Sequence, residues 1–420
     1  MRHNAHHQTA LEILDTYRPT KSPLANHIKN ELKNRRYAGS KDRRAITEII
    51  YTVMRRAPLL LEALGLPEWE IKKGRPLMLT YLALYQGAGT IDDIFCGDGH
   101  SPSICTDAEH DFIKTLSLEK GFSKAAQNWM GEWLFTVLQE TCDPKDFDQF
   151  KEQAPFDIRV NLPLDHIKKI LEQDETITLE ETAFSPLSLR VSGQHNLQNH
   201  PLFQEGAFDI QDESSQIVSL LCDPKPSMKI LDLCAGAGGK SLALAALCPE
   251  AEITATDIAP HRLDIAQKRA RQQGLTNIRF TDHRAFIRDV SHIDLYDLVL
   301  VDAPCSGTGT LRRHPELKVS LSPDIIDDYI RLQRQLLIDA QRFVGPKGRL
   351  VYATCSLLKR ENQDQAKRFL EDHPFFSEVK AKDICDKLLK KTPKETDFFL
   401  ELTPGRHKTD GFFAAFFDKN

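Results

Sequence analysis

Two of the nine cysteines follow apolar runs in short turns, where their thiols could act as nucleophiles. Cys305 follows residues 298–302 in the stretch Asp-Ala-Pro-Cys-Ser-Gly-Thr-Gly, and Cys355 follows residues 349–354 in Ala-Thr-Cys-Ser. Most cysteines are simply small buried residues, but a thiolate is the strongest common protein nucleophile near neutral pH. If the two runs are neighbouring parallel strands, both thiols lie in one crevice.

A glycine-rich turn joins an apolar run to a helical stretch upstream of both cysteines. It reads Asp-Leu-Cys-Ala-Gly-Ala-Gly-Gly-Lys-Ser over residues 232–241, and its glycines let backbone N–H groups approach a ligand closely. A phosphate-binding P-loop requires glycine where Cys234 stands, and a dinucleotide-binding turn requires glycine where Ser241 stands. Two interpretations are left: the nucleoside site of an S-adenosylmethionine enzyme, or a tight turn without a ligand.

Three aspartates end successive apolar runs after this turn. Asp257 lies 21 residues past Gly236, close to the ~20 residues expected for an acid that binds ribose hydroxyls. Asp282 ends the next run, where a carboxylate could accept from an adenine amino group, and Asp302 ends the run before Cys305. A single aspartate could be a helix cap, but three at successive strand ends favour a nucleoside site.

A thiolate beside a methyl donor suits the methylation of a pyrimidine base. Carbon 5 of a pyrimidine is a poor nucleophile, but thiolate attack at carbon 6 makes carbon 5 enamine-like, so that it accepts a methyl group. A base must then remove the proton at carbon 5 before the thiolate leaves. This chemistry uses a thiolate and a second group, both beside the methyl donor.

The elements that must position these residues alternate from about residue 206 onward. Strands are predicted at residues 229–234, 253–257, 278–282, 298–302 and 349–354, with helices such as 262–273 and 324–343 between them. The alternation predicts a parallel sheet with helices on both faces. Ligands of such sheets bind at the carboxyl ends of the strands.

The first half of the chain follows a different pattern. Residues 1–118 show apolar residues at helical spacing and are predicted to be helical, with a loop over the polar run 92–110. Residues 119–205 contain two alternating runs, 155–161 and 187–191, which predict a small α+β module.

Composition and charge exclude several classes of protein. The chain has 420 residues, 41% of them hydrophobic and 27% charged, as in ordinary globular proteins. The longest apolar runs are far shorter than the ~20 residues of a membrane span, and the N-terminus predicts no signal peptide. The nine cysteines lack paired CxxC spacing, so we expect reduced thiols in the cytoplasm and no metal site.

The net charge of −5 conceals an asymmetry. Residues 1–60 contain twelve Lys or Arg against five Asp or Glu. A basic end on an acidic chain suggests a polyanion partner there, although a solvated helical surface explains the charge equally well.

Taken together, these motifs resemble the Sun-type RNA cytosine-5 methyltransferases. The resemblance rests on the two cysteine turns, the glycine-rich turn, and the segments 211–216, 312–316 and 410–413. The N-terminal part, with Asp-Arg-Arg at 42–44 leading into 48–51, resembles the NusB-like helical domain that precedes catalysis in the bacterial small-subunit ribosomal RNA methyltransferase B group.

The resemblance implies a fold and an arrangement of domains. A Rossmann-like α/β class I methyltransferase domain with a mostly parallel seven-stranded sheet is expected over 206–420. An all-α NusB-like domain over 1–118 and the small α+β module over 119–205 would precede it and bind RNA.

The resemblance also implies residue roles. Cys355 would attack carbon 6 of cytosine, and Cys305 would assist release of the product. S-adenosylmethionine would be held by Cys234, Ala235, Gly236, Ala237, Gly238, Gly239, Lys240, Asp257, Asp282 and Asp302. Asp302 could instead contact the cytosine, and Lys240 either serves a ligand or pairs with an acid.

The turn departs from the family's usual Cys-Ala-Ala-Pro-Gly-Gly-Lys-Thr. Gly236, Ala237 and Ser241 stand where the family has Ala, Pro and Thr, which predicts a looser backbone. We expect a monomeric enzyme that acts on ribosomal RNA, with no membrane partner. The alternatives are a transfer RNA methyltransferase of the same family and a non-catalytic RNA-binding assembly factor, against which the intact cysteines and strand-end acids argue.

Overall fold

A computed structural model describes the chain except residues 120, 194–195 and 289–294. The described residues form two units. Unit 1 comprises Met1–Glu140, Phe147–Gln153 and Leu311–Pro323, and unit 2 comprises Thr141–Asp146, Ala154–Thr310 and Asp324–Asn420.

Unit 1 is helical in the part that the structure describes, and its amphipathic helices bury one apolar core. Leu24, Ile28 and Leu32, and likewise Ile46 and Ile50, point into this core, as their helical spacing predicts. The helices are α1 (His3–Thr16), α2 (Leu24–Asn34), α3 (Ser40–Arg55), α4 (Ala57–Ala63), α5 (Gly74–Tyr85), α6 (Ala88–Ile94), α7 (Asp107–Thr115), α8 (Lys124–Gln127), α9 (Glu132–Leu138) and α17 (Leu317–Ser320). Helix α10 (Pro144–Gln149) is divided between the two units.

The segment Leu311–Pro323, far along the chain, belongs to unit 1 through buried polar contacts. Glu316 accepts a hydrogen bond from the Leu24 backbone N–H (3.1 Å), and the Lys318 ammonium donates to the Phe150 carbonyl (2.9 Å). Burial lowers the pKa of Lys318 to about 7. The chain therefore enters unit 1 directly after the Cys305 loop.

The smaller sheet of unit 2 is antiparallel in all its pairings, with the strand order β2-β3-β1-β4. Its strands are β1 (Phe156–Val160), β2 (Ile177–Glu181), β3 (Ser188–Gly193) and β4 (Phe208–Ile210), and helices α11 (Leu164–Leu171) and α12 (Pro201–Gln204) accompany them. The two strands predicted in this region are confirmed as β1 and β3.

The larger sheet has the order β10-β12-β9-β8-β5-β6-β7, and β11 pairs with β12. Strands β7, β6, β5, β8 and β9 are parallel, whereas β10, β11 and β12 join by antiparallel pairing. The strands are β5 (Lys229–Asp232), β6 (Glu252–Asp257), β7 (Ile278–Asp282), β8 (Tyr296–Asp302), β9 (Val344–Thr354), β10 (Phe376–Val379), β11 (Leu400–Leu402) and β12 (Phe412–Lys419).

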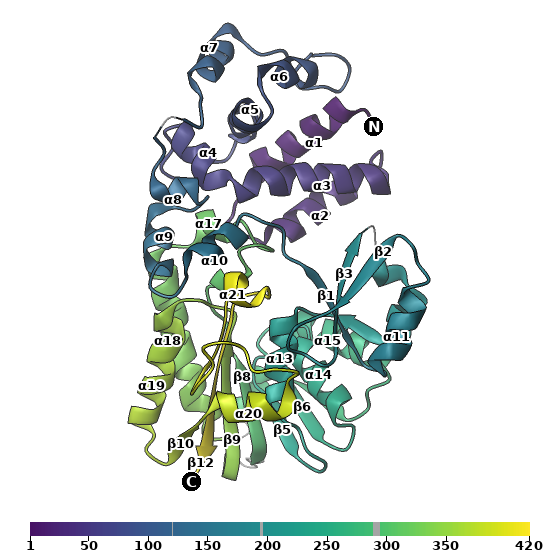
Figure 1. Cartoon of the computed structure of the whole chain (residues 1–420), viewed down its shortest axis with the longest axis vertical. Helices are drawn as coiled ribbons and strands as arrows, with labels where there is room; N and C mark the ends of the chain where they lie inside the picture. The colour runs from purple at the N-terminus through teal and green to yellow at the C-terminus, as the bar shows by residue number, and fades with distance from the viewer. Residues whose placement is uncertain (120, 194–195, 289–294) are drawn as a thin grey trace. The chain divides into compact units, whose positions relative to one another are not determined.

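Helices cover both faces of the larger sheet, as Figure 1 shows. Along β5, Ile230 faces one apolar core and its neighbour Leu231 the other, because successive side chains of a strand point to opposite faces. The first core is closed by α13 (Glu213–Leu221), α14 (Gly239–Leu247) and α20 (Ala381–Leu388), and the second by α18 (Pro323–Ala340) and α19 (Gln363–Asp372). Three further helices are α15 (Pro260–Gln272), α16 (His283–Arg288) and α21 (Pro404–His407).

The Rossmann-like α/β fold is confirmed, with three differences from the predicted organisation. The larger sheet has eight strands in the described chain instead of seven. The loop predicted over 92–110 is shorter, because α6 ends at Ile94 and α7 begins at Asp107. Most of 119–140 groups with unit 1, and the boundary expected at 206 falls inside the smaller sheet, since β4 pairs with β1.

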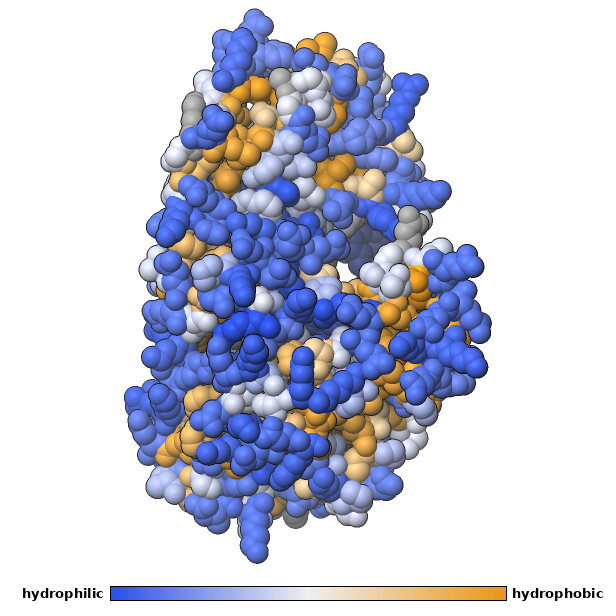
Figure 2. All heavy atoms as spheres, in the orientation of Figure 1, coloured by the Kyte–Doolittle hydropathy of each residue, from blue (hydrophilic) through white to orange (hydrophobic). Residues whose placement is uncertain are grey.

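The exterior is largely polar on the face drawn in Figure 2. Among the described helices, none is long and apolar enough to cross a bilayer.

Candidate active site

The carboxyl ends of the parallel strands bring the predicted residues to one edge of the larger sheet. Asp257 at the end of β6 lies opposite Asp282 at the end of β7, and Asp302 at the end of β8 lies opposite Ala353 in β9. Cys305 follows β8, and Cys355 follows β9. The sequence-based expectation that these residues share one edge is confirmed.

The two thiols lie side by side, with 3.3 Å between the Cys305 and Cys355 sulfur atoms. Both cysteines are free and partly exposed. The hydrogen bond with Cys355, together with burial, holds the pKa of the Cys305 thiol well above its ordinary value. Cys305 therefore keeps its proton near neutral pH.

The glycine-rich turn between β5 and α14 is held tightly against its surroundings. Gly236 (φ +56°) and Gly238 (φ +85°) adopt left-handed backbone conformations. A Cβ at Gly236 would lie 2.5 Å from the Arg262 guanidinium, and one at Gly238 would lie 2.8 Å from Ala266 Cβ. Only glycine fits both positions without displacement.

Two of the aspartates are engaged by the backbone. Asp257 accepts from the Gly236 N–H (2.8 Å) and the Ala259 N–H (2.9 Å), so it ties the turn to β6. Asp282 accepts from the Ala285 N–H (3.0 Å) in the first turn of α16. One oxygen of Asp282 thus acts as a helix cap, the role that the sequence had also left open for a single aspartate.

Lys240 pairs with Asp302. Its ammonium lies 2.6 Å from an Asp302 carboxylate oxygen and 4.6 Å from the centre of the Phe412 ring. Lys240 is 7% exposed and Asp302 30% exposed, so this ion pair links the glycine-rich turn to the start of the Cys305 loop.

Known proteins share both the sequence pattern and the fold around this site. Residues 219–418 match the family of 16S rRNA methyltransferases RsmB/F. The chain is 31% identical to the ribosomal RNA small subunit methyltransferase B of Shewanella oneidensis over 288 residues, which cover 67% of this chain and 65% of that one. It is 29% identical to the probable enzyme of that name from Synechocystis, over 89% of this chain and 90% of that one.

Among solved structures, that of the protein PH0851 superimposes with a TM-score of 0.80 at 25% identity, covering 99% of each chain. The domain that carries both cysteines belongs to the RsmB/F methyltransferase family. The matched domain is thus that of a methyltransferase, with S-adenosylmethionine as the methyl donor.

The residues present in this RsmB/F domain fit that donor. The turn carries no side chain at Gly236, Gly238 and Gly239, so a nucleoside bound at the turn would meet its backbone. Asp232 at the end of β5 is 1% exposed, and one of its carboxylate oxygens has no partner within the described residues. A buried, unpartnered carboxylate oxygen suits an ammonium group such as that of the donor's amino-acid moiety.

Asp232 was not singled out from the sequence, although it ends the first strand as Asp257 ends the second. Its other oxygen accepts from the Ser241 hydroxyl at 2.5 Å. Burial raises the pKa of Asp232 to about 7.

Three further residues outside the turn hold its carbonyl groups, and the sequence did not single them out for this role. Arg269 in α15 donates to the Ala237 carbonyl (2.6 Å) and to the Asp209 carboxylate (2.5 Å). Gln211 and Arg159 both donate to the Gly239 carbonyl, at 3.2 and 3.4 Å. The looser turn predicted from Ala237 is therefore stiffened from outside.

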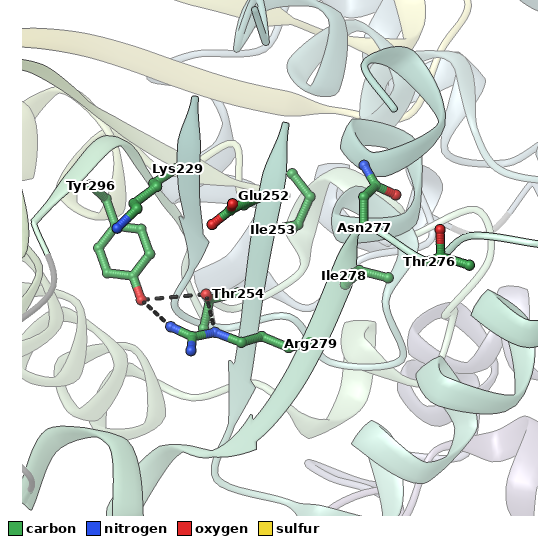
Figure 3. Close-up of a pocket in the computed structure, with 9 residues that line it drawn as sticks. All are labelled: Lys229, Glu252, Ile253, Thr254, Thr276, Asn277, Ile278, Arg279 and Tyr296. Carbon is green, nitrogen blue, oxygen red and sulfur yellow. Dashed lines mark hydrogen bonds between the residues drawn. The ribbon is translucent and has the colours of Figure 1, made fainter. Parts of the chain in front are cut away.

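A separate pocket of about 280 Å³ lies at the opposite, amino ends of the same strands (Figure 3). Arg279 donates to Thr254 (2.8 Å) and Tyr296 (3.2 Å), so three of the polar side chains of this pocket bond to one another. None of its nine lining residues is a cysteine. The reactive groups therefore lie at the carboxyl ends, as expected for this fold. No cluster of metal ligands occurs among the described residues.

Proposed function

We propose that this enzyme methylates carbon 5 of a cytosine in RNA, in particular in small-subunit ribosomal RNA. Cys355 forms a covalent bond to carbon 6, and Cys305 assists release. The observation that carries the proposal is the 3.3 Å spacing of two thiols at the strand edge that also holds the glycine-rich turn. The names of the RsmB/F relatives, which are ribosomal RNA methyltransferases, support RNA as the substrate.

In the proposed reaction, the Cys355 thiolate attacks carbon 6 and makes carbon 5 nucleophilic. The donor supplies the methyl group to carbon 5 and is left as S-adenosylhomocysteine. While Cys355 is bound to carbon 6, it no longer raises the pKa of Cys305 through its hydrogen bond or its charge. Cys305 then loses its own proton to water more easily, and its thiolate can take the proton from carbon 5. Elimination of the Cys355 thiolate restores the aromatic ring.

Lys240 and Asp302 lie between the two halves of this site. Because Asp302 starts the Cys305 loop and Lys240 ends the glycine-rich turn, their 2.6 Å contact links the loop that carries a thiol to the turn that would hold the donor. A properly placed donor and nucleophile supply much of the rate enhancement in such two-substrate reactions. The target base must be unpaired or flipped out to reach the site.

Unit 1 is proposed to bind RNA phosphates. Among the cations near the start of α3, Arg35 pairs with Glu31 at 2.6 Å, and Arg43 donates to the Ala38 carbonyl at 2.9 Å. Arg36, Lys41 and Arg44 are exposed. These three exposed side chains are therefore the better candidates for phosphate contacts.

The proposal is tested by the methylated product. RNA from a deletion strain is incubated with the enzyme and labelled S-adenosylmethionine, digested to nucleosides and analysed by mass spectrometry. We expect 5-methylcytidine, located by bisulfite sequencing at a cytosine of small-subunit ribosomal RNA, and none with Cys355→Ala. Label in another nucleoside, or only in transfer RNA, would contradict the proposal.

A further inference from the structure

One buried carboxylate lies beneath both cysteine loops. Glu361 has no exposed surface. One of its oxygens accepts from the Ser306 N–H and the Gln333 side-chain amide, both at 2.9 Å. The other accepts from the Ser306 and Ser356 hydroxyls, both at 2.5 Å. Ser306 directly follows Cys305, and Ser356 directly follows Cys355.

These contacts tie the two loops to one group. The Ser306 and Ser356 hydroxyls also lie 3.1 Å from each other, and both are buried. The Glu361 backbone is itself anchored, since its carbonyl accepts from the Tyr352 hydroxyl (2.6 Å) in β9. Gln333 extends the network to the Pro304 carbonyl (3.0 Å), one residue before Cys305.

The Glu361 carboxylate is stabilised by hydrogen bonds rather than by an ion pair. In the described part of the chain, its carboxylate is contacted by neutral donors alone. A buried charge is tolerated only when it is fully hydrogen-bonded. Four donors supply that satisfaction here, and three of them come from the two serines that follow the cysteines. The carboxylate thus requires both loops to be in place, and both loops require the carboxylate.

We propose that Glu361 is a positioning residue that sets the spacing of the Cys305 and Cys355 thiols. It acts through the two serines and does not touch the reacting atoms. The inference rests on the proposed function only for its kinetic test, because the thiol spacing exists without RNA.

The ionisation of Cys305 supports this role. After its hydrogen bond with Cys355 and its burial, the charges of Cys355 and Glu361 raise the pKa of the Cys305 thiol further. Burial raises the pKa values of Tyr329 and Tyr352, and the negative charges of Cys305 and Glu361 raise both further. The Glu361 charge therefore adds to the hydrogen bond and the burial that favour the protonated Cys305 thiol.

Two substitutions of Glu361 test its negative charge and the length of its side chain separately. Glu361→Gln keeps the shape and removes the charge, whereas Glu361→Asp keeps the charge but is one methylene too short to span both loops. Alkylation of Cys305 by iodoacetamide is followed against pH by mass spectrometry of the intact protein, without RNA. We expect Glu361→Gln to lower the midpoint of Cys305 alkylation by roughly one pH unit, because a neighbouring negative charge is removed.

Steady-state kinetics with RNA supply the second readout. For both variants we expect kcat to fall about tenfold to a hundredfold, because a reacting group moves by a fraction of an ångström to about 1 Å. The KM for S-adenosylmethionine should remain unchanged. The matched control is Glu213→Gln, which alters another buried carboxylate that accepts from the Phe184 and Ser185 N–H groups. Glu213→Gln should leave the pH midpoint of Cys305 alkylation unchanged.

A Cys305 midpoint that does not move in folded Glu361→Gln, or a wild-type kcat in Glu361→Asp, overturns the proposal. If Glu361→Gln does not fold, Ser356→Ala decides, since it removes one hydroxyl contact and leaves three donors. A wild-type kcat there also overturns the proposal, and a reduced kcat with unchanged KM supports it. A wild-type enzyme without methylation activity would instead count against the proposed function, while the alkylation curve still reports on Glu361.

Discussion

The cysteine loops and the glycine-rich turn lie at the same edge of one sheet but are held in different ways. The loops after β8 and β9 are bound to each other through one buried carboxylate, Glu361, from a nearby segment. The turn at 234–240 is held by residues outside it, such as Arg269 in α15 and Gln211 after β4. A substitution on the cysteine side should therefore change the rate of the chemistry, and one on the turn side should change the affinity for the donor.

The largest effect is expected from the cysteines themselves. Cys355→Ala removes the nucleophile, so no adduct forms and methylation stops. Cys305→Ala leaves attack and methyl transfer possible but impairs proton removal and expulsion of Cys355. The methylated RNA should then stay attached to the protein. The measurement is an RNA-linked band that survives denaturing electrophoresis and requires S-adenosylmethionine.

The double variant is the control for this trap and should give no band. If Cys355→Ala traps RNA and Cys305→Ala only loses activity, the two roles are reversed. If neither substitution affects methylation, both thiols are packing residues and the contrast between the two sides of the site disappears.

On the turn side, Asp232 gives a pH-dependent effect on stability. Burial raises its folded-state pKa to about 7, above the ordinary value of an aspartate, so the folded state binds the extra proton between about pH 4 and pH 7. The stability contributed by the protonated form is complete below about pH 4 and is lost as the pH rises to about 7, by roughly 4 kcal/mol.

Asp232→Asn should flatten this dependence. Urea unfolding of both proteins from pH 4 to pH 8 measures it, and parallel curves would show that the Asp232 carboxyl ionises normally. This result would distinguish the two sides of the site. On the cysteine side the raised pKa is that of Cys305, so that side should not contribute to the pH dependence of stability below pH 7.

The five parallel strands of the larger sheet, and the acids that end β6, β7 and β8, were predictable because buried parallel strands are continuous apolar runs. The helix α7 was also predictable in principle. Thr106 and Glu109 form a reciprocal capping box at its start, with hydrogen bonds of 3.2 and 2.8 Å between side chains and backbone. Our prediction of a loop over 92–110 was wrong at that end because it gave no weight to this capping signal.

Other features depend on contacts that sequence spacing does not reveal. The pairing of β4 with β1 joins residues about fifty positions apart, which is why the boundary at 206 divided one sheet. Glu361 belongs to none of the motifs described in the sequence analysis. Its role follows only from the four hydrogen-bond donors that the fold brings to its carboxylate. By its sequence Arg269 resembles any surface cation of a helix, and only the fold brings it within hydrogen-bonding distance of the Ala237 carbonyl.

Removal of the Arg269 side chain should weaken donor binding without changing the chemistry. Arg269→Ala removes hydrogen bonds to Ala237 and Asp209, and we expect an increase of about tenfold in the Kd for S-adenosylhomocysteine. Calorimetry measures this value, and kcat at saturating donor should stay as in the wild type. Arg271→Ala, an exposed arginine of the same helix, is the matched control.

The same substitution offers a rescue. Ala237→Pro introduces the residue usual at this position in the Sun-type family and restricts the backbone of the turn directly. In the Arg269→Ala background it should recover part of the donor affinity. A tenfold loss of kcat at unchanged Kd in Arg269→Ala would remove the distinction between the two sides of the site.

The smallest effect on either side is expected from the exposed cations of unit 1. Replacing Arg36, Lys41 and Arg44 by Gln should leave donor affinity and Cys305 alkylation unchanged, because these residues belong to the other unit. If they bind phosphates, RNA binding should weaken for all sequences, and the slope of log K against log salt should flatten by about 0.7–0.9 for each phosphate that is no longer neutralised. Filter binding at several salt concentrations measures the slope.

The control replaces three exposed lysines of unit 2, Lys367, Lys387 and Lys394, with the same change in net charge. Equal slopes in the two triple variants would show that only net charge matters and that the basic end of the chain is a solvated surface.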